Sequence, residues 1–269
     1  MQKKPVMESG QTDFSASPKK RRDRKWKKRT VVAAILIIFV IPAAILLGAQ
    51  WMQTFQFSFF GITVSIRSYY FISLFMIICT LIPFFMVFEK RKPQARELVV
   101  IAVLSAIAVA GRAAFFMLPQ FKPVVAIVII AGVCFGGEAG FLVGAVSGFV
   151  SNFFFGQGPW TPWQMFSFGI IGFLAGVFFQ TGLLNKSRLA LCIFGGLSTF
   201  FIYGILMDIS SVMMVSSTTS QEPFWVAMVS GIPFNLIHAA ATVFFLFVIS
   251  QPMIEKLDRI KIKYGLLEP

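Results

Sequence analysis

The residue most able to do chemistry in this chain is a single arginine inside an apolar segment. Arg112 lies near the end of the run 98–118, which carries no other charged side chain. A guanidinium in apolar surroundings is costly unless it reaches water or finds hydrogen-bond acceptors. We therefore read Arg112 either as part of a binding site or its lid, or as a side chain that extends to the nearby surface.

Amide and aromatic side chains gather in residues 147–164 (SGFVSNFFFGQGPWTPWQ). Flat aromatic faces and amides suit a heterocyclic or amide-bearing ligand. The two tryptophans also fit an interfacial aromatic belt, but a belt does not explain an amide within an apolar helix. The candidates are Asn152, Gln157, Trp160, Trp163 and Gln164.

A second polar pair occurs near the chain's end, where Asn235 and His238 are spaced i, i+3 and so share one helix face. His238 is either a binding group or a hydrogen-bonded packing residue. Asp208 is expected at the end of a helix, where it either pairs with Arg112 or Lys122 or is solvated.

An enzymatic alternative is an intramembrane serine protease with Ser147 or Ser151 as nucleophile and His238 as base. The sequence AVSG around Ser147 lacks the first glycine of a G-x-S-G motif, and no oxyanion-hole donor is evident. The chain also has no G-x-x-x-x-G-K-[ST] segment and no H-E-x-x-H pair. We therefore expect no enzyme, no metal site and no cofactor.

These residues must be positioned by membrane helices. Hydrophobic residues make up 57% of the 269 positions and charged residues 13%, which is too apolar for a soluble domain. The apolar runs are long and do not alternate, which favours helices over a barrel and predicts an all-α membrane protein. Cys79, Cys134 and Cys192 each fall inside an apolar run and are read as small core residues.

About eight transmembrane helices are expected, since one span needs roughly 20 apolar residues. Residues 31–88 hold two of them, with a short outer hairpin or an irregular loop between them, and 89–97 form a linker. A six-helix substrate-binding bundle occupies 98–256, and 257–269 form a tail. The predicted spans are 31–50, 69–88, 98–118, 123–136, 139–155, 163–182, 189–206 and 229–249.

The charge distribution orients these helices. Of the 24 Lys and Arg, 21 fall in segments that eight spans place on one side, with Arg67 and Lys122 on the other and Arg112 inside a span. Basic loops stay in the cytoplasm. We therefore expect a protein of the bacterial cytoplasmic membrane with both termini in the cytoplasm. We read the basic arm 1–30 as a determinant of topology or a contact for anionic lipid, and the net charge of +13 does not indicate nucleic acid.

Prolines and small residues shape the two ends and the helix contacts. Prolines concentrate in the predicted outer loops and helix ends, which predicts stiff outer connections. Small residues recur every four positions, a pattern that lets helices approach closely. These small-residue stripes are Ala102, Ala106 and Ala110, then Gly140, Gly144 and Gly148, then Gly172 and Gly176.

The six-helix block resembles the substrate-specific S component of energy-coupling factor (ECF) vitamin importers, in particular the cobalamin-type members. AVLSAIAVA matches the family's alanine stripe, and FKPVVAIVIIAG followed by VSNFFFGQGPWTPWQ is similar to its second to fourth helices. The matching positions in these two runs are Lys122, Pro123, Asn152, Gly158, Trp160, Thr161 and Gln164. The basic arm and the first two helices depart from a minimal S component.

This resemblance implies a receptor that captures a vitamin, cobalamin or a corrinoid relative first, at its outer face. It implies as partners a transmembrane T component, docked on the alanine stripe, and two ATPase subunits. The expected substrate-binding residues are Arg112, Lys122, Asn152, Trp160, Trp163, Gln164, Asn235 and His238. The alternative from another class is a membrane sensor or scaffold that transports nothing.

Overall fold

The computed structural model describes residues 54–59, 62–67, 69–75, 95–215 and 222–264, with isolated positions at 35, 39, 43 and 78. Most of the first two predicted spans, and Cys79, lie outside the described residues. The elements are β1 (Thr54–Phe59), β2 (Ile62–Arg67), α4 (Ala95–Ala114), α5 (Val124–Phe135), α6 (Gly137–Phe155), α7 (Thr161–Gln180), α8 (Arg188–Leu197), the π-helix η2 (Ser198–Gly204), α9 (Ile205–Val215) and α10 (Glu222–Tyr264).

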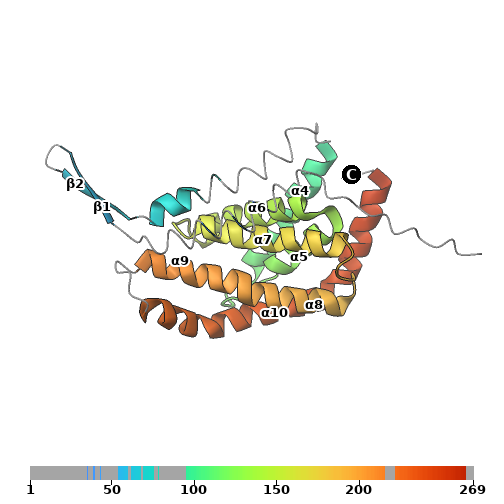
Figure 1. The fold of residues 1–269 in the computed structure, drawn as a ribbon. Helices are drawn as coiled ribbons and strands as arrows, with labels where there is room; N and C mark the ends of the chain where they lie inside the picture. Colours follow the sequence, from blue (N-terminus) through green and yellow to red (C-terminus); the bar gives the residue numbers. More distant parts are fainter. Residues whose placement is uncertain are drawn as a thin grey trace, which may run out of the picture.

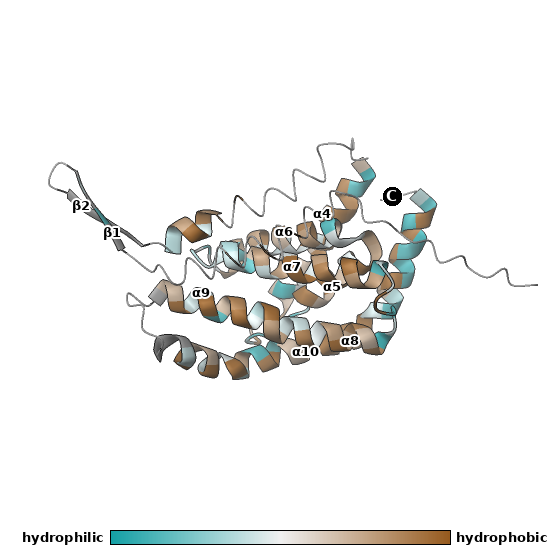
Figure 2. Cartoon of the chain, viewed as in Figure 1, coloured by the Kyte–Doolittle hydropathy of each residue, from teal (hydrophilic) through white to brown (hydrophobic). Residues whose placement is uncertain are grey.

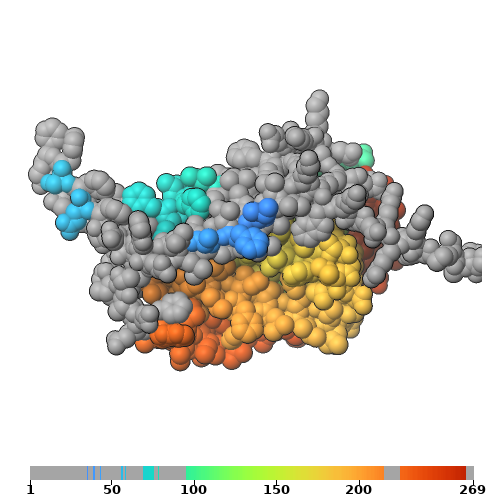
Figure 3. Space-filling model, viewed as in Figure 1, coloured from blue at the N-terminus to red at the C-terminus, as the bar shows by residue number. Residues whose placement is uncertain are grey.

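The helices form one bundle, and five of the described helical stretches are long and apolar enough to cross a membrane. One of these stretches runs without a break through α8, η2 and α9, and α5 is a shorter apolar helix. The chain is therefore an all-α, multi-pass protein of the cell membrane. Figure 3 shows α7 and the continuous α8–α9 helix beside each other on one face.

Helix α5 occupies the centre of the bundle. Its sequence, VVAIVIIAGVCF, is apolar on every side, and all its residues are buried. A helix without a polar face avoids water on every side, either among other helices or in lipid, and α5 is surrounded by helices. Helices α4, α6, α7, α8 and α10 all pack against α5, and Cys134 within it is buried, as Cys192 is in α8.

Glycines set the spacing between α5, α6 and α7. A Cβ added at Gly140 of α6 would lie 2.7 Å from the Cα of Gly132 in α5 and would also meet the carbonyl oxygen of Gly172 in α7. A Cβ at Gly144 would lie 2.5 Å from the carbonyl oxygen of Phe168. The predicted glycine stripes are therefore confirmed as close intramolecular packing.

The segment between the first two predicted spans is a hairpin. Strands β1 and β2 pair antiparallel, with Thr54 opposite Arg67 and Phe59 opposite Ile62. Of the two alternatives, hairpin or irregular loop, the structure has the hairpin, and Figure 1 shows it extending away from the bundle.

Two of the helices are longer than the spans predicted for them. The predicted span 189–206 continues through α9 to Val215, so Asp208 lies inside a helix and not at its end. Helix α10 begins before residue 229 and runs to Tyr264. Its last part bends across one end of the bundle (Figure 1) and is more hydrophilic than the rest (Figure 2).

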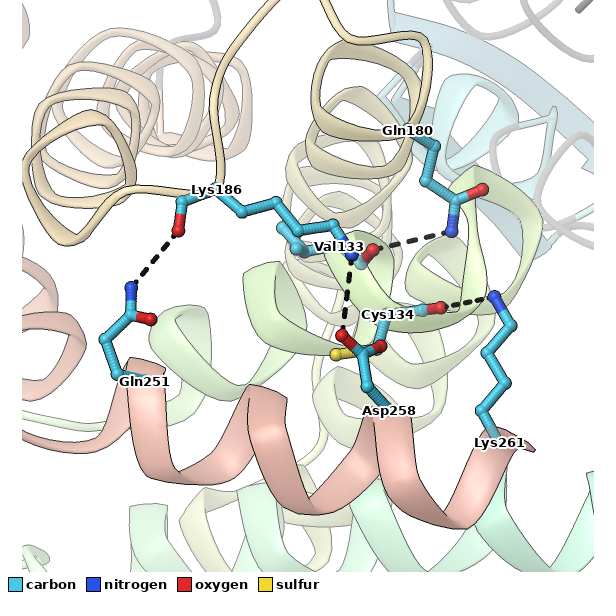
Figure 4. A network of polar contacts seen from close by, with 7 residues as sticks. All are labelled: Val133, Cys134, Gln180, Lys186, Gln251, Asp258 and Lys261. Carbon is cyan, nitrogen blue, oxygen red and sulfur yellow. Dashed lines mark hydrogen bonds and ion pairs between the residues drawn. The ribbon is translucent and has the colours of Figure 1, made fainter. Parts of the chain in front are cut away.

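This last part of α10 ties together the end of the bundle that we predict to face the cytoplasm. Lys261 Nζ donates to the carbonyl oxygen of Cys134 at 2.9 Å, so it satisfies one of the free carbonyls at the end of α5 (Figure 4). Lys186, in the loop before α8, lies 3.8 Å from Asp258. Gln251 donates to the carbonyl oxygen of Lys186 at 3.2 Å.

Replacing Gly140 with alanine is expected to destabilise the bundle by about 1 to 3 kcal/mol, because the new methyl group meets backbone atoms that cannot move independently. The measurement is thermal unfolding of the purified protein in detergent. The matched control is Gly196→Ala, whose Cβ would meet only the Val243 side chain, at 3.0 Å. Equal melting temperatures for the two variants would contradict the close-packing interpretation.

Candidate functional site

Three neutral acceptors from two helices converge on Arg112. Its Nη1 atom donates to the Ser151 hydroxyl, to Asn152 Oδ1 at 3.0 Å and to Gln164 Oε1 at 3.3 Å. Ser151 and Asn152 belong to the last turns of α6, and Gln164 belongs to the first turn of α7. All four side chains are buried, so Arg112 Nη1 finds its acceptors inside the bundle, and the side chain does not extend to the surface.

The Thr161 hydroxyl fixes the turn that joins α6 to α7. It accepts from Asn152 Nδ2 at 3.1 Å and from the Gly158 amide at 3.2 Å, and it donates to Gln157 Oε1 at 2.9 Å. A hydroxyl offers one donor and two acceptor positions, and all three are used here. Thr161 therefore orients the Asn152 amide, whose oxygen faces Arg112.

Gln164 extends the cluster to η2 and α10. Its Nε2 atom donates to the Tyr203 hydroxyl at 2.9 Å. The Tyr203 ring stacks on Phe168 and makes an edge contact with His238, with 4.6 Å between the ring centroids. His238 is 3% exposed, and its Nδ1 atom has no hydrogen-bond partner among the described residues.

A second basic side chain borders the same cluster. Lys122 Nζ lies 5.2 Å from the centroid of the Phe155 ring, and Arg112 Cζ lies 4.5 Å from the same centroid. Lys122 also donates to the carbonyl oxygens of Phe115 and Leu118. Partial burial, and then the positive charge of Arg112, lower the pKa of Lys122 from its ordinary value.

The expectation for Asp208 was wrong in part. Asn235 Nδ2 donates to Asp208 Oδ2 at 2.9 Å, and among the described residues no ion pair joins Asp208 to Arg112 or Lys122. Asn235 also lies against Gly204 of η2, where a Cβ would come within 2.6 Å of its amide carbon. Asn235 and His238 therefore face the same segment, η2, as their spacing predicted.

The two tryptophans have different surroundings. The Trp163 indole is fully buried, stacks on Tyr69 with 6.0 Å between centroids, and donates to the Ser73 hydroxyl at 3.2 Å. The Tyr69 hydroxyl in turn bonds to Ser210 of α9 at 3.2 Å. Trp163 thus packs the segment 69–75 onto the bundle, while the half-buried Trp160 ring lies over Gly158 in the turn.

Three residues of the cluster were not among the predicted binding residues: Ser151, Thr161 and Tyr203. Tyr203 is one of four tyrosines in the chain and lies in an apolar span, which is the signal that could have identified it. Ser151 had been considered only as a nucleophile. In the structure it accepts from Arg112 and donates to the Gly148 carbonyl, and the structure gives neither Ser147 nor Ser151 a hydrogen bond with His238.

The alanine stripe lies on the surface of α4. Ala102, Ala106 and Ala110 are all exposed, whereas Leu104 and Ala108 on the other face of the helix are buried. The stripe and the Arg112 cluster therefore use different surfaces of the same helix.

A family model and several curated proteins match this chain. The model described as "ECF-type riboflavin transporter, S component" matches residues 92–257. UPF0397 proteins of Aliivibrio salmonicida, Vibrio atlanticus and Aliivibrio fischeri are 33%, 36% and 32% identical to it over 125, 101 and 124 residues. These matches cover 45%, 36% and 44% of this chain, and 66%, 53% and 65% of the relatives' own lengths. No solved structure matches the chain.

Replacing Thr161 with valine is expected to destabilise the protein by about 1 to 3 kcal/mol, since the buried Asn152 amide and the Gly158 amide lose their acceptor. Thermal unfolding in detergent measures this effect. Thr181→Val is the control, because among the described residues the hydroxyl of Thr181, directly after α7, bonds only to carbonyls in the last turn of α7. A melting temperature for Thr161→Val equal to that of the control would contradict the role given to this hydroxyl.

Proposed function

Because the chain belongs to the family of S components of ECF-type transporters, we propose that it binds a vitamin or vitamin-like molecule at the Arg112 cluster for import. Members of this family are substrate-binding membrane subunits and not enzymes. The energy for transport would come from ATP hydrolysis by two partner ATPase subunits, coupled through a T component.

The observation that carries this proposal is the convergence of Ser151, Asn152 and Gln164 on Arg112. A membrane helix does not need such groups in order to span the bilayer, and burying them is costly. Polar groups held in a fixed arrangement among apolar helices are typical of a small-molecule site. Their position at the outer end of the bundle, as the basic loops predict it, suits capture from outside the cell.

Two vitamins are the first candidates for the ligand. Cobalamin or a corrinoid relative is favoured by the resemblance of the segments 121–132 and 150–164 to cobalamin-type S components. Riboflavin is favoured by the description of the matching family model. Both carry carbonyl oxygens that can accept hydrogen bonds from Arg112 and flat rings that can pack on Phe155 or Tyr203.

The exposed alanine stripe of α4 supports docking of the T component. Small side chains let another helix approach the backbone closely, and Ala102, Ala106 and Ala110 form such a surface along the middle of α4. Two of the expected binding residues, Trp160 and Asn235, are not hydrogen-bond partners of Arg112. We propose that Trp160 shapes the turn, and Asn235 shapes η2, around the ligand. Trp163 is proposed to act through packing.

Replacing Asn152 or Gln164 with leucine is expected to weaken ligand binding by about 1 to 3 kcal/mol, because polar groups of the ligand and of Arg112 lose partners. Calorimetry on purified protein with cobalamin and with riboflavin measures the change for whichever vitamin the wild type binds. The control is Gln180→Leu at the opposite end of α7, where the amide donates to the Val133 carbonyl. Unchanged affinity in both variants would place the binding site elsewhere.

Ala106→Trp is expected to leave binding unchanged and to abolish uptake, because the indole fills the docking surface without touching the cluster. Uptake of the bound vitamin in cells and co-purification with the T and ATPase subunits measure the two effects. Ala240→Trp on the exposed face of α10 is the matched control. If wild type binds its ligand but never co-purifies with these subunits, the import role is contradicted and a sensor is favoured.

A further inference from the structure

Among the described residues, the Arg112 guanidinium has no anionic partner. It is 8% exposed, and its hydrogen bonds within the described residues all run from Nη1 to the neutral oxygens of Ser151, Asn152 and Gln164. Within the part of the chain that the structure describes, the one ion pair joins Lys186 to Asp258 at the opposite end of the bundle. A buried charge is stabilised far better by an opposite charge than by neutral acceptors.

Lys122 adds to the positive charge at this end. Its ammonium group and the Arg112 guanidinium lie near the same Phe155 ring, and the acceptors of Lys122 are backbone carbonyls and not carboxylates. Asp208 accepts its hydrogen bond from Asn235 instead. Two basic groups thus border one cluster, and the described groups that accept their hydrogen bonds are all uncharged.

A second observation, independent of this charge, points to a ligand. His238 Nδ1 is buried and has no hydrogen-bond partner in the part of the chain that the structure describes, although buried polar atoms are nearly always hydrogen-bonded. The chain of contacts from Arg112 through Gln164 and Tyr203 ends at the His238 ring. A molecule bound at the cluster can supply the hydrogen bond that His238 lacks.

We propose that the ligand is an organic anion, whose carboxylate or phosphate group binds Arg112 while its polar remainder reaches His238. Guanidinium groups bind these anions with two parallel hydrogen bonds, and Arg112 has donors beyond Nη1 that can form them. The inference rests on the proposed function, and it narrows the substrate class. Among corrinoids it selects cobalamin, which contains a phosphodiester, over cobinamide, which lacks it.

The test compares matched pairs of probes on the purified full-length protein in lipid nanodiscs. The pairs are cobalamin and cobinamide, flavin mononucleotide and riboflavin, nicotinate and nicotinamide, and biotin and biotinamide. An equimolar mixture of all eight, and then the small-molecule fraction of a bacterial extract, is passed over the protein, and retained compounds are identified by mass spectrometry. Calorimetry then gives the affinity of each retained compound.

We expect the retained compound to carry an acidic group and to bind at least tenfold more tightly than its neutral counterpart. Arg112→Gln should abolish this preference, while Arg112→Lys should keep part of it. Arg188→Gln, at the other end of the bundle where the guanidinium lies over Phe247, should bind as wild type does. The comparison of acid with neutral probe uses wild-type protein and so does not depend on the folding of any variant.

Each of the remaining outcomes contradicts either the anion preference or the proposed function. A retained neutral or cationic compound, or equal affinity for both members of a pair, contradicts the anion preference and leaves the proposed function intact. Retention of nothing from either the mixture or the extract contradicts the proposed function, and this inference with it. Carboxylate and phosphate ligands are distinguished by which pair shows the preference.

Discussion

The backbones of α5, α6 and α7 meet at glycines, and the geometry of the rest of the bundle depends on that close approach. A Cβ added at any of three glycines would collide with the backbone of a facing helix. These glycines are Gly132, Gly140 and Gly172. Dispersion and packing replace the hydrophobic effect between helices in lipid, so close contact is the main source of stability there. The same contact fixes the end of α6 against the start of α7, which is where the polar cluster forms.

The polar cluster illustrates how a membrane protein can keep a charged side chain buried. Arg112 of α4 uses side chains of α6 and α7 as acceptors, and Gln164 passes the hydrogen-bond chain on to Tyr203 of η2. Each amide has a second partner, because Asn152 also bonds to Thr161 and Gln164 to Tyr203. Amides that are held at both ends lose little freedom on binding a ligand, and such preorganisation favours affinity. The segment η2, which carries Tyr203, is a π-helix. Helices of this type occur frequently at functional sites.

The two ends of the bundle are built differently. At the end predicted to face the cytoplasm, the last part of α10 bonds to the end of α5 and to the loop before α8 through charged and amide side chains. At the opposite end, the residues 69–75 pack on Trp163 and bond to Ser210 of α9. The segment 69–75, which precedes the residues that the family model matches, therefore contacts the bundle close to the turn that orients Asn152.

The sequence alone determined the membrane helices of the described bundle, their order and several members of the polar cluster. Apolar runs of span length admit only helices in lipid, and Arg112, Asn152 and Gln164 stood out because polar side chains are costly in such runs. Only the tertiary structure decided which of them meet. Spacing predicted that Asn235 and His238 share a face, but not that Asp208 would bond to Asn235 instead of a cation, because that pairing depends on how far the helix runs past residue 206. Likewise, the sequence does not distinguish Trp163 from Trp160. Trp163 packs on Tyr69 because of the rotation of α7 about its axis. This rotation is set by the glycine contacts with α6 and not by any local sequence pattern.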